Sequence, residues 1–242
     1  MTTQGSRTDE KIVAFVLYPG LTPLDLVGPL QVFASLQKFA PMYRAVVVAE
    51  RIAPLPTDIE VQMVADKTFA EVPHPDILVV PGGTGPTLRA MSDQTLRDYV
   101  RTAAGSAEIV ASVCTGSLIL AAVGLLDSHP RTTHWVARDL LKSYGTPYQQ
   151  TRWVEHGKII TAAGVSAGID MALYLVAKLT DLETMRNVQL DLEYDPHPPF
   201  GRIDLERMGF MPRMIRGLVS ITAPLLTRKP KRLSKQAGWT YS

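Results

Sequence analysis

Residues 108–124 read EIVASVCTGSLILAAVG, and this stretch decides the fold of the chain. It opens with a short apolar run over residues 109–113, passes through Cys114 and Thr115, and continues with apolar side chains at helical spacing. The pattern predicts a strand, a sharp turn and a helix, with Cys114 at the turn. This is the arrangement of a nucleophile elbow in which cysteine takes the place of serine.

Cys114 is the only cysteine in the chain, and its position favours a reactive thiol. The unpaired N–H groups at a helix N-terminus favour an anion. We therefore expect the pKa of this thiol to fall from ~8.5 into the range of roughly 3.5 to 7.5. A lone cysteine among apolar residues is otherwise an inert core residue. The place at the junction, with Gly116 allowing close packing, favours the reactive role.

Strands and helices alternate along the rest of the chain. Most of the strands are continuously apolar, as in a parallel sheet buried on both faces. The sequence predicts strands over residues 11–18, 43–50, 60–64, 76–80, 131–135, 148–154 and 158–162, and helices over about 25–38, 93–104, 136–144, 165–179 and 182–192. This order predicts an α/β fold with a mostly parallel sheet and helices on both faces.

Composition narrows the class of protein. The 242 residues are 46% hydrophobic and carry a net charge of +2, which is ordinary for a globular domain and indicates no nucleic-acid partner. The polar start, MTTQGSRTDEK, is unlike a signal peptide, and a single cysteine excludes an intrachain disulfide, so we expect a cytoplasmic protein. We divide the chain into a flexible tail (1–10), an α/β domain (11–195) and a C-terminal extension of unknown role (196–242).

Three strand ends carry residues suited to chemistry: Asp25, the pair Gly82 and Gly83, and Cys114. Ligands bind beyond the carboxyl ends of the strands in an open parallel sheet, so these residues belong at one edge. A carboxyl group near a thiol can act as a general acid and base if burial raises its pKa. Paired glycines let a backbone N–H approach a reacting atom. The PGGTG stretch lacks the Lys-Ser/Thr ending of a phosphate loop.

These residues resemble the ThiJ/PfpI superfamily over roughly residues 10 to 195. The segments YPGLTPLDLVGP, SVCTGSLILAAVGLLD with RTTHW after it, and ITAAGVSAGIDMAL are most similar to isonitrile hydratases. They also resemble the ligand-sensing domains of AraC-type regulators. Glyoxalase and deglycase activities are common in the superfamily and form a third alternative.

The resemblance implies a flavodoxin-like three-layer sandwich and a set of site residues. Cys114 matches the nucleophile, Asp25 the acidic partner, and Thr115 the residue after the nucleophile. Gly83, next to Gly82, matches the glycine whose amide faces the substrate. In the protease-like branch a histidine follows the cysteine, so Thr115 argues against a peptidase. The resemblance further implies a small apolar isonitrile substrate and a homodimer with the site near the subunit interface. The five histidines show no metal-ligand spacing such as HExxH, so we expect no metal, and we expect no cofactor.

Several alternatives stay open at this point. Asp25 can be a helix cap, and His134 can be either the base for the thiol or a structural residue. The protein can be a small-molecule or redox sensor rather than an enzyme. A DNA-binding regulator is disfavoured, because only about 45 residues follow residue 195 and they contain no pair of helix-turn-helix units. The basic run RKPKRLSK is expected to be a solvated end rather than a membrane contact, although apolar residues before it, from Ile215 to Leu226, are compatible with a cationic amphipathic segment.

Overall fold

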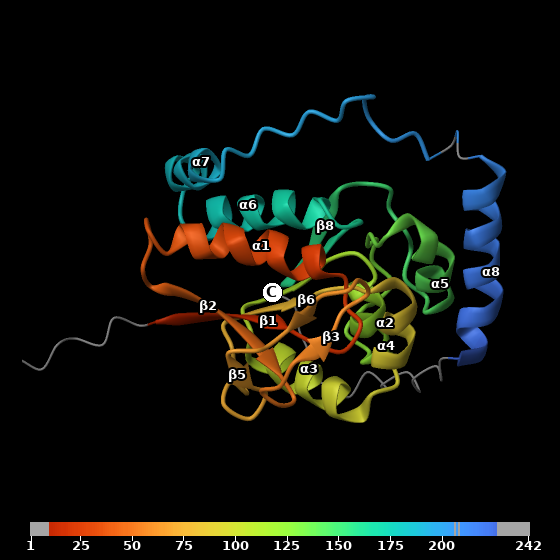
Figure 1. Cartoon of the computed structure of the whole chain (residues 1–242), viewed down its shortest axis with the longest axis horizontal. Coiled ribbons are helices and arrows are strands. Elements are labelled where there is room, and N and C mark those ends of the chain that lie inside the picture. Colours follow the sequence, from red (N-terminus) through yellow and green to blue (C-terminus); the bar gives the residue numbers. More distant parts are fainter. Residues whose placement is uncertain (1–9, 206, 208, 227–242) are drawn as a thin grey trace, which may run out of the picture.

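The computed structural model describes residues 10–205, 207 and 209–226. A seven-stranded sheet forms its centre, in the order β5-β2-β1-β6-β7-β9-β8 (Figure 1). Every neighbouring pair is parallel except β8 and β9. The strands are β1 (Lys11–Val16), β2 (Tyr43–Ala49), β5 (Lys67–Thr68), β6 (Ile77–Val80), β7 (Ile109–Ser112), β8 (Trp153–His156) and β9 (Ile159–Ala162). A separate two-stranded ribbon pairs β3 (Leu55–Pro56) with β4 (Gln62–Met63).

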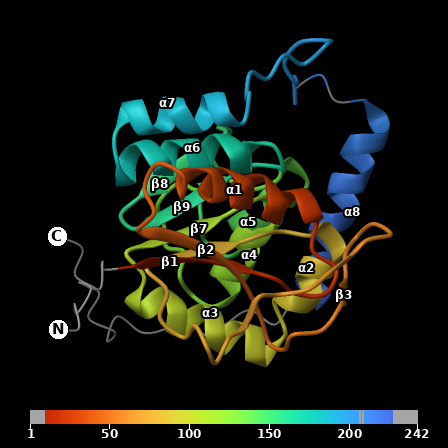
Figure 2. The ribbon, with the colours of Figure 1, turned by 60° about the vertical axis from the view of Figure 1, so that its left-hand side comes forward.

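Helices cover both faces of the sheet, which confirms the predicted flavodoxin-like three-layer α/β fold. One layer holds α1 (Pro23–Leu36), α6 (Ala167–Leu179) and α7 (Leu182–Asp191), which contact one another. Figure 2 shows them above the sheet, with α3 (Gln94–Ser106) below it. Helix α3 contacts α4 (Gly116–Ala122), which in turn contacts α2 (Thr84–Ala90) and α5 (Arg138–Ser143). Strands β6, β7 and β9 are buried along their whole length, as their continuous apolar sequences predict.

Local sequence explains where the helices begin. Pro23 stands at the first turn of α1, where its fixed φ suits a helix and its missing N–H is not needed. Asp93 caps α3 by accepting a hydrogen bond from the Leu96 N–H, and Asp181 caps α7 in the same way through Thr184. Asp25 lies in the first turn of α1 and does not serve as its cap, because residue Thr22 holds that position.

Several predicted elements are wrong in extent or kind. Residues 131–135 form no strand; Arg131 makes one isolated bridge to Tyr148, and the short 3₁₀ helix η1 (Trp135–Ala137) follows. The strand predicted over 148–154 starts later, as β8, because its partner β9 determines the pairing. The strand predicted over 60–64 shrinks to β4. The PGGTG turn continues directly into α2, which the sequence analysis did not predict.

The C-terminal part leaves the sheet after α7. The described residues between α7 and the last helix (192–205, 207 and 209) belong to no helix or strand. The last helix, α8 (Phe210–Leu226), stands beside α5 at the right of Figure 1. Helix α8 contacts α5 and η1. The basic run RKPKRLSK and the expected tail, apart from Glu10, lie outside the described residues. Among the described helices, none is both long and apolar enough to cross a membrane.

Candidate active site

The sheet topology brings the predicted residues to one place. From β1 the chain first extends the sheet on one side through β2, and then returns to the other side of β1 with β6. Such a switch point is where open α/β sheets bind ligands, beyond the carboxyl ends of the strands. Asp25 follows β1, Gly82 and Gly83 follow β6, and Cys114 follows β7, so all lie at this edge.

Cys114 occupies a strained elbow between β7 and α4. Its φ is +57°, in the left-handed region that a residue with a Cβ rarely adopts. The surroundings hold it there: its N–H donates to the carbonyl oxygens of Ala162 (3.1 Å) and Ala163 (3.0 Å), and its own carbonyl accepts from Thr133 Oγ1 (3.0 Å). Gly116 is required next to it, because a Cβ there would lie 2.1 Å from the Val80 carbonyl oxygen.

Asp25 is completely buried beside the thiol. Its Oδ2 accepts a hydrogen bond from the Gly82 N–H at 3.2 Å. Its Oδ1 is buried without a hydrogen-bond partner among the described residues. Burial raises the pKa of Asp25 to about 7, although the Cys114 thiol and the Gly82 N–H partly oppose that rise. A carboxyl with this pKa can both accept and donate a proton near neutral pH.

The thiol itself differs from the expectation. We expected the helix N-terminus to lower the pKa of Cys114, but burial raises it, and the charge of Asp25 raises it further. The backbone amides of Thr115 and Val165 favour the thiolate without outweighing these two effects. Cys114 is only 2% exposed, so desolvation of the anion exceeds what the helix end provides. At neutral pH the Cys114 sulfur is therefore a protonated thiol, with the Asp25 carboxyl as its titratable neighbour.

Thr115 and Gly83 contact each other. The Gly83 N–H donates to Thr115 Oγ1 at 3.0 Å, and the same hydroxyl lies 2.8 Å from Thr87 Oγ1. We expected the Gly83 amide to face the substrate, whereas here it holds the Thr115 hydroxyl. The glycines serve close packing as well: a Cβ on Gly82 would lie 2.5 Å from the Thr115 nitrogen and 3.0 Å from Asp25 Oδ2.

His134 has a structural contact that explains its presence. Its Nδ1 accepts from the Val136 N–H at 3.4 Å and so caps η1, and its ring packs where a Cβ on Gly164 would stand. Burial lowers the pKa of His134, which keeps the ring neutral. Of the two roles left open by the sequence, these contacts fit the structural one.

Three residues of the site region were not identified from the sequence. Val165 supplies an amide toward Cys114 and has a φ of +28°. The Thr87 hydroxyl lies 2.8 Å from the Thr115 hydroxyl, and the Tyr18 hydroxyl donates a hydrogen bond to the Pro81 carbonyl oxygen at 3.0 Å. The sequence could not identify these residues. Every residue except proline has a backbone amide, and Thr and Tyr are also common at positions without a role in chemistry.

One group of side chains among the described residues has the composition of a metal site. Asp127, His129 and His156 place ligand atoms within 4.8 Å of one another. His129 Nδ1 lies 2.7 Å from Asp127 Oδ2, and the two imidazole rings stack 3.6 Å apart. His156 pairs with Ile159 at the start of β9, whereas Ala162 at the end of β9 accepts the hydrogen bond from the Cys114 N–H. The group therefore lies at the edge of the sheet opposite to Cys114. Asp127 and His129 are two residues apart, whereas His156 comes much later in the chain, and the three match no ligand-spacing motif.

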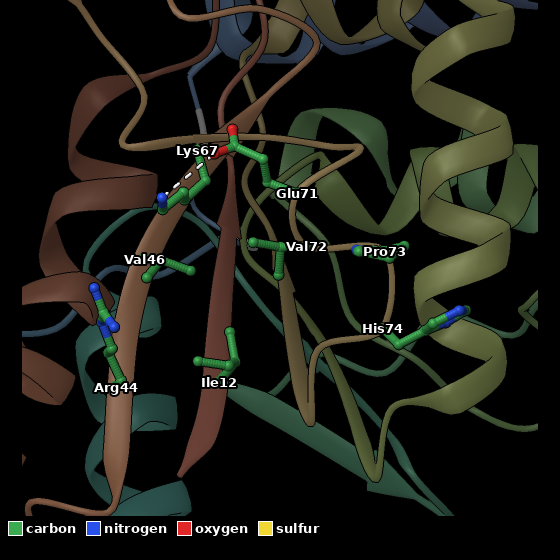
Figure 3. A pocket seen from close by; sticks show the side chains of 8 residues that line it. All are labelled: Ile12, Arg44, Val46, Lys67, Glu71, Val72, Pro73 and His74. Atoms are coloured by element: carbon green, nitrogen blue, oxygen red, sulfur yellow. Dashed lines mark hydrogen bonds and ion pairs between the residues drawn. The ribbon is translucent and has the colours of Figure 1, made fainter.

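A pocket of about 490 Å³ also lies away from the thiol. It opens over β1, β2 and β5, with Ile12 and Val46 among its apolar side chains and Lys67 paired to Glu71 at 3.3 Å (Figure 3). None of the predicted site residues lines it. Burial and hydrogen bonding, rather than this cavity, mark Cys114 and Asp25 as the candidate pair.

The fold and the elbow define an α/β protein with a cysteine at the turn between a central strand and a helix. A family model agrees with this class. Residues 11–178 match the DJ-1/PfpI family, and the chain belongs to that family. The sequence-based resemblance to ThiJ/PfpI proteins is thereby confirmed.

Individual relatives fall into more than one functional class. The chain is 41% identical to the isonitrile hydratase of Pseudomonas putida over 188 residues, which is 78% of this chain and 80% of that protein. It is 29% identical to the HTH-type transcriptional regulator CdhR of Pseudomonas aeruginosa, covering 68% of this chain and 49% of the regulator. The crystal structure of a ThiJ/PfpI family protein from Pseudomonas syringae superposes with a TM-score of 0.82 at 35% identity, covering 90% of each chain.

Proposed function

We propose that the protein is an isonitrile hydratase, which adds water to an isonitrile and releases an N-substituted formamide. The observation that carries the proposal is the buried pair of Asp25 and Cys114, in which a carboxyl with a pKa of about 7 lies beside a strained thiol. The similarity to the Pseudomonas putida isonitrile hydratase supports the choice of substrate.

The first half of the reaction forms a covalent adduct. The Asp25 carboxylate removes the thiol proton while the sulfur bonds to the terminal carbon of R–NC, and Asp25 then delivers the proton to that carbon. The product is a thioimidate, S–CH=N–R. An isonitrile suits a cysteine that is only 2% exposed, because the terminal carbon of an isonitrile carries no substituent and lies at the end of a linear group.

The second half releases the product. Water attacks the thioimidate carbon, and Asp25 takes a proton from the water and passes it to the nitrogen. The tetrahedral adduct then loses its hydroxyl proton through Asp25 to the sulfur, the C–S bond breaks, and the formamide leaves. The unpartnered Oδ1 of Asp25 provides the acceptor for these transfers. The Thr115 hydroxyl, held by Gly83 and Thr87, positions the adduct.

The test is turnover of a simple alkyl isonitrile, measured beside methylglyoxal. Cys114→Ala should abolish hydration, because the covalent step is lost. Asp25→Asn keeps the shape of the side chain but cannot transfer a proton, so kcat should fall at least about a hundredfold with a smaller change in KM.

His134→Ala is the matched control for the base. If it abolishes turnover while Asp25→Asn retains most of it, the base is the histidine and the mechanism is wrong. If the wild-type protein hydrates no isonitrile but converts methylglyoxal, a glyoxalase takes the place of the hydratase. If it converts neither and still binds a small ligand, the protein is a sensor.

A further inference from the structure

We propose that helix α8 is a membrane-docking element, which lays its outer face on an anionic lipid surface. The proposal rests on the way this helix is mounted on the domain and on the charge of the segment that it begins. It is independent of the reaction at Cys114.

The side of α8 that faces the domain carries the polar contacts described for this helix, beside two apolar residues. Arg216 pairs with Asp139 of α5 at 3.3 Å, and Ser220 Oγ lies 3.3 Å from the same carboxylate oxygen. Val219, half-buried, packs against the core from the same side. These three residues, together with Pro212, recur at the three- and four-residue spacing of one helical face.

The opposite side of α8 is apolar and faces outward. Its large side chains share helical spacing and stay exposed in the chain: Met211 (58%), Met214 (49%), Ile215 (44%), Leu218 (62%) and Ile221 (70%). Phe210, 80% exposed, extends this stripe at the first residue of the helix. A surface helix of a globular protein normally has the reverse arrangement, with its apolar stripe on the core. A contiguous exposed stripe of this kind marks an interaction surface.

The charge of the segment selects the partner. Residues 210–242 contain seven cations and no acidic residue: Arg213, Arg216, which pairs with Asp139 on the domain side, and Arg228, Lys229, Lys231, Arg232 and Lys235, which lie outside the described residues. The rest of the chain has 23 acidic residues against 18 cations. An apolar helical face accompanied by cations fits the interface of a membrane that contains anionic lipid, where each cation near the surface contributes about 1 kcal/mol.

A second copy of the chain fits less well. Two copies joined through the α8 stripe would bring two such cationic segments together, and like charges repel. A lipid surface satisfies both features at once, since the apolar side chains enter the acyl boundary while the cations meet the headgroups.

The experiment is flotation of the full-length protein with phosphatidylcholine vesicles, with and without phosphatidylserine. We expect binding that increases with phosphatidylserine and weakens at high salt. The double variant Ile215→Ser/Leu218→Ser should lose at least about tenfold in vesicle partition, because two apolar side chains no longer enter the bilayer. The charge variant Lys229→Glu/Lys231→Glu/Arg232→Glu should lose the dependence on phosphatidylserine.

The matched control is Leu182→Ser/Leu190→Ser, which removes two exposed leucines from α7 and should leave binding unchanged. Circular dichroism and light scattering accompany each variant. The proposal is overturned if the wild-type protein ignores phosphatidylserine vesicles, or if the α7 control loses as much binding as the α8 variant. It is also overturned if the α8 variant only converts an oligomer to a monomer, because α8 is then a self-association surface.

Discussion

At the scale of single residues, the chemistry depends on one proton shared by Asp25 and Cys114. The reactive state of the proposed hydratase holds the thiol proton and an ionised carboxyl. Since the pKa of Asp25 is raised to about 7, the carboxyl as well as the thiol is protonated below that pH, and the pair lacks its base. We expect kcat/KM for an alkyl isonitrile to rise with pH through about 7 and then level off. A profile that is flat from pH 5.5 to 8.5 would contradict this assignment.

The same carboxyl should also affect stability. Its pKa is raised in the folded protein, so its contribution is most favourable at low pH and is lost as pH rises from about 4 to about 7. A shift from 3.8 to about 7 corresponds to roughly 4 kcal/mol in the free energy of unfolding. Urea unfolding at pH 4.5 and pH 8 should show this loss in the wild-type protein and not in Asp25→Asn.

The exposed Asp195→Asn is the control for this measurement, because Asp195 lies on the surface outside the site. It should follow the wild-type pH dependence. If Asp25→Asn loses stability with pH as steeply as the wild type does, another group is responsible and Asp25 titrates normally.

At the scale of elements, the elbow depends on the close approach of β6 to the start of α4. Gly116→Ala would place a Cβ 2.1 Å from the Val80 carbonyl oxygen and 2.8 Å from that of Pro81, both backbone atoms that cannot move alone. We expect a loss of at least about 1–3 kcal/mol in the free energy of unfolding, measured in urea, together with reduced turnover.

Gly105→Ala is the matched comparison, since this helical glycine of α3 has nothing within 4 Å of an added Cβ. It should be neutral or stabilising by about 0.5–1 kcal/mol. Equal effects of the two substitutions would show that the packing of the elbow is not what makes Gly116 necessary.

The elbow also shows what the sequence could predict. Its apolar strand, its turn at Cys114 and its amphipathic continuation are local patterns, so the sequence predicted them together with the sheet. The pKa of Cys114 was predicted in the wrong direction, because a local pattern contains the helix end but not the burial that opposes it. The sequence also did not predict that the Val165 amide faces Cys114 or that the Gly83 amide donates to the Thr115 hydroxyl. Both contacts join segments that are distant in the sequence. The strand predicted over 131–135 failed for a related reason, since no neighbouring strand continues its single bridge.

At the scale of the whole molecule, the chain combines a tightly packed sheet with helix α8, whose described side chains make few contacts with the domain. Strands β6 and β7 are fully buried, whereas α8 rests on α5 and η1 through Val219 and the polar contacts to Asp139. A partly exposed ion pair contributes about 0–1 kcal/mol, and elements with few buried contacts open at low free energy. Helix α8 should therefore open without unfolding of the sheet.

Asp139→Ala tests this separation, because it removes the acceptor of both Arg216 and Ser220. We expect amide hydrogen exchange over residues 210–222 to accelerate by up to about fivefold, the equivalent of about 1 kcal/mol, while exchange in β6 and β7 and the thermal midpoint stay unchanged. Asp98→Ala removes a comparable surface ion pair, with Arg101 on α3, and should leave exchange in α8 as it is. If Asp139→Ala instead accelerates exchange throughout the sheet, α8 unfolds cooperatively with the domain, and the attachment through Asp139 supports the core.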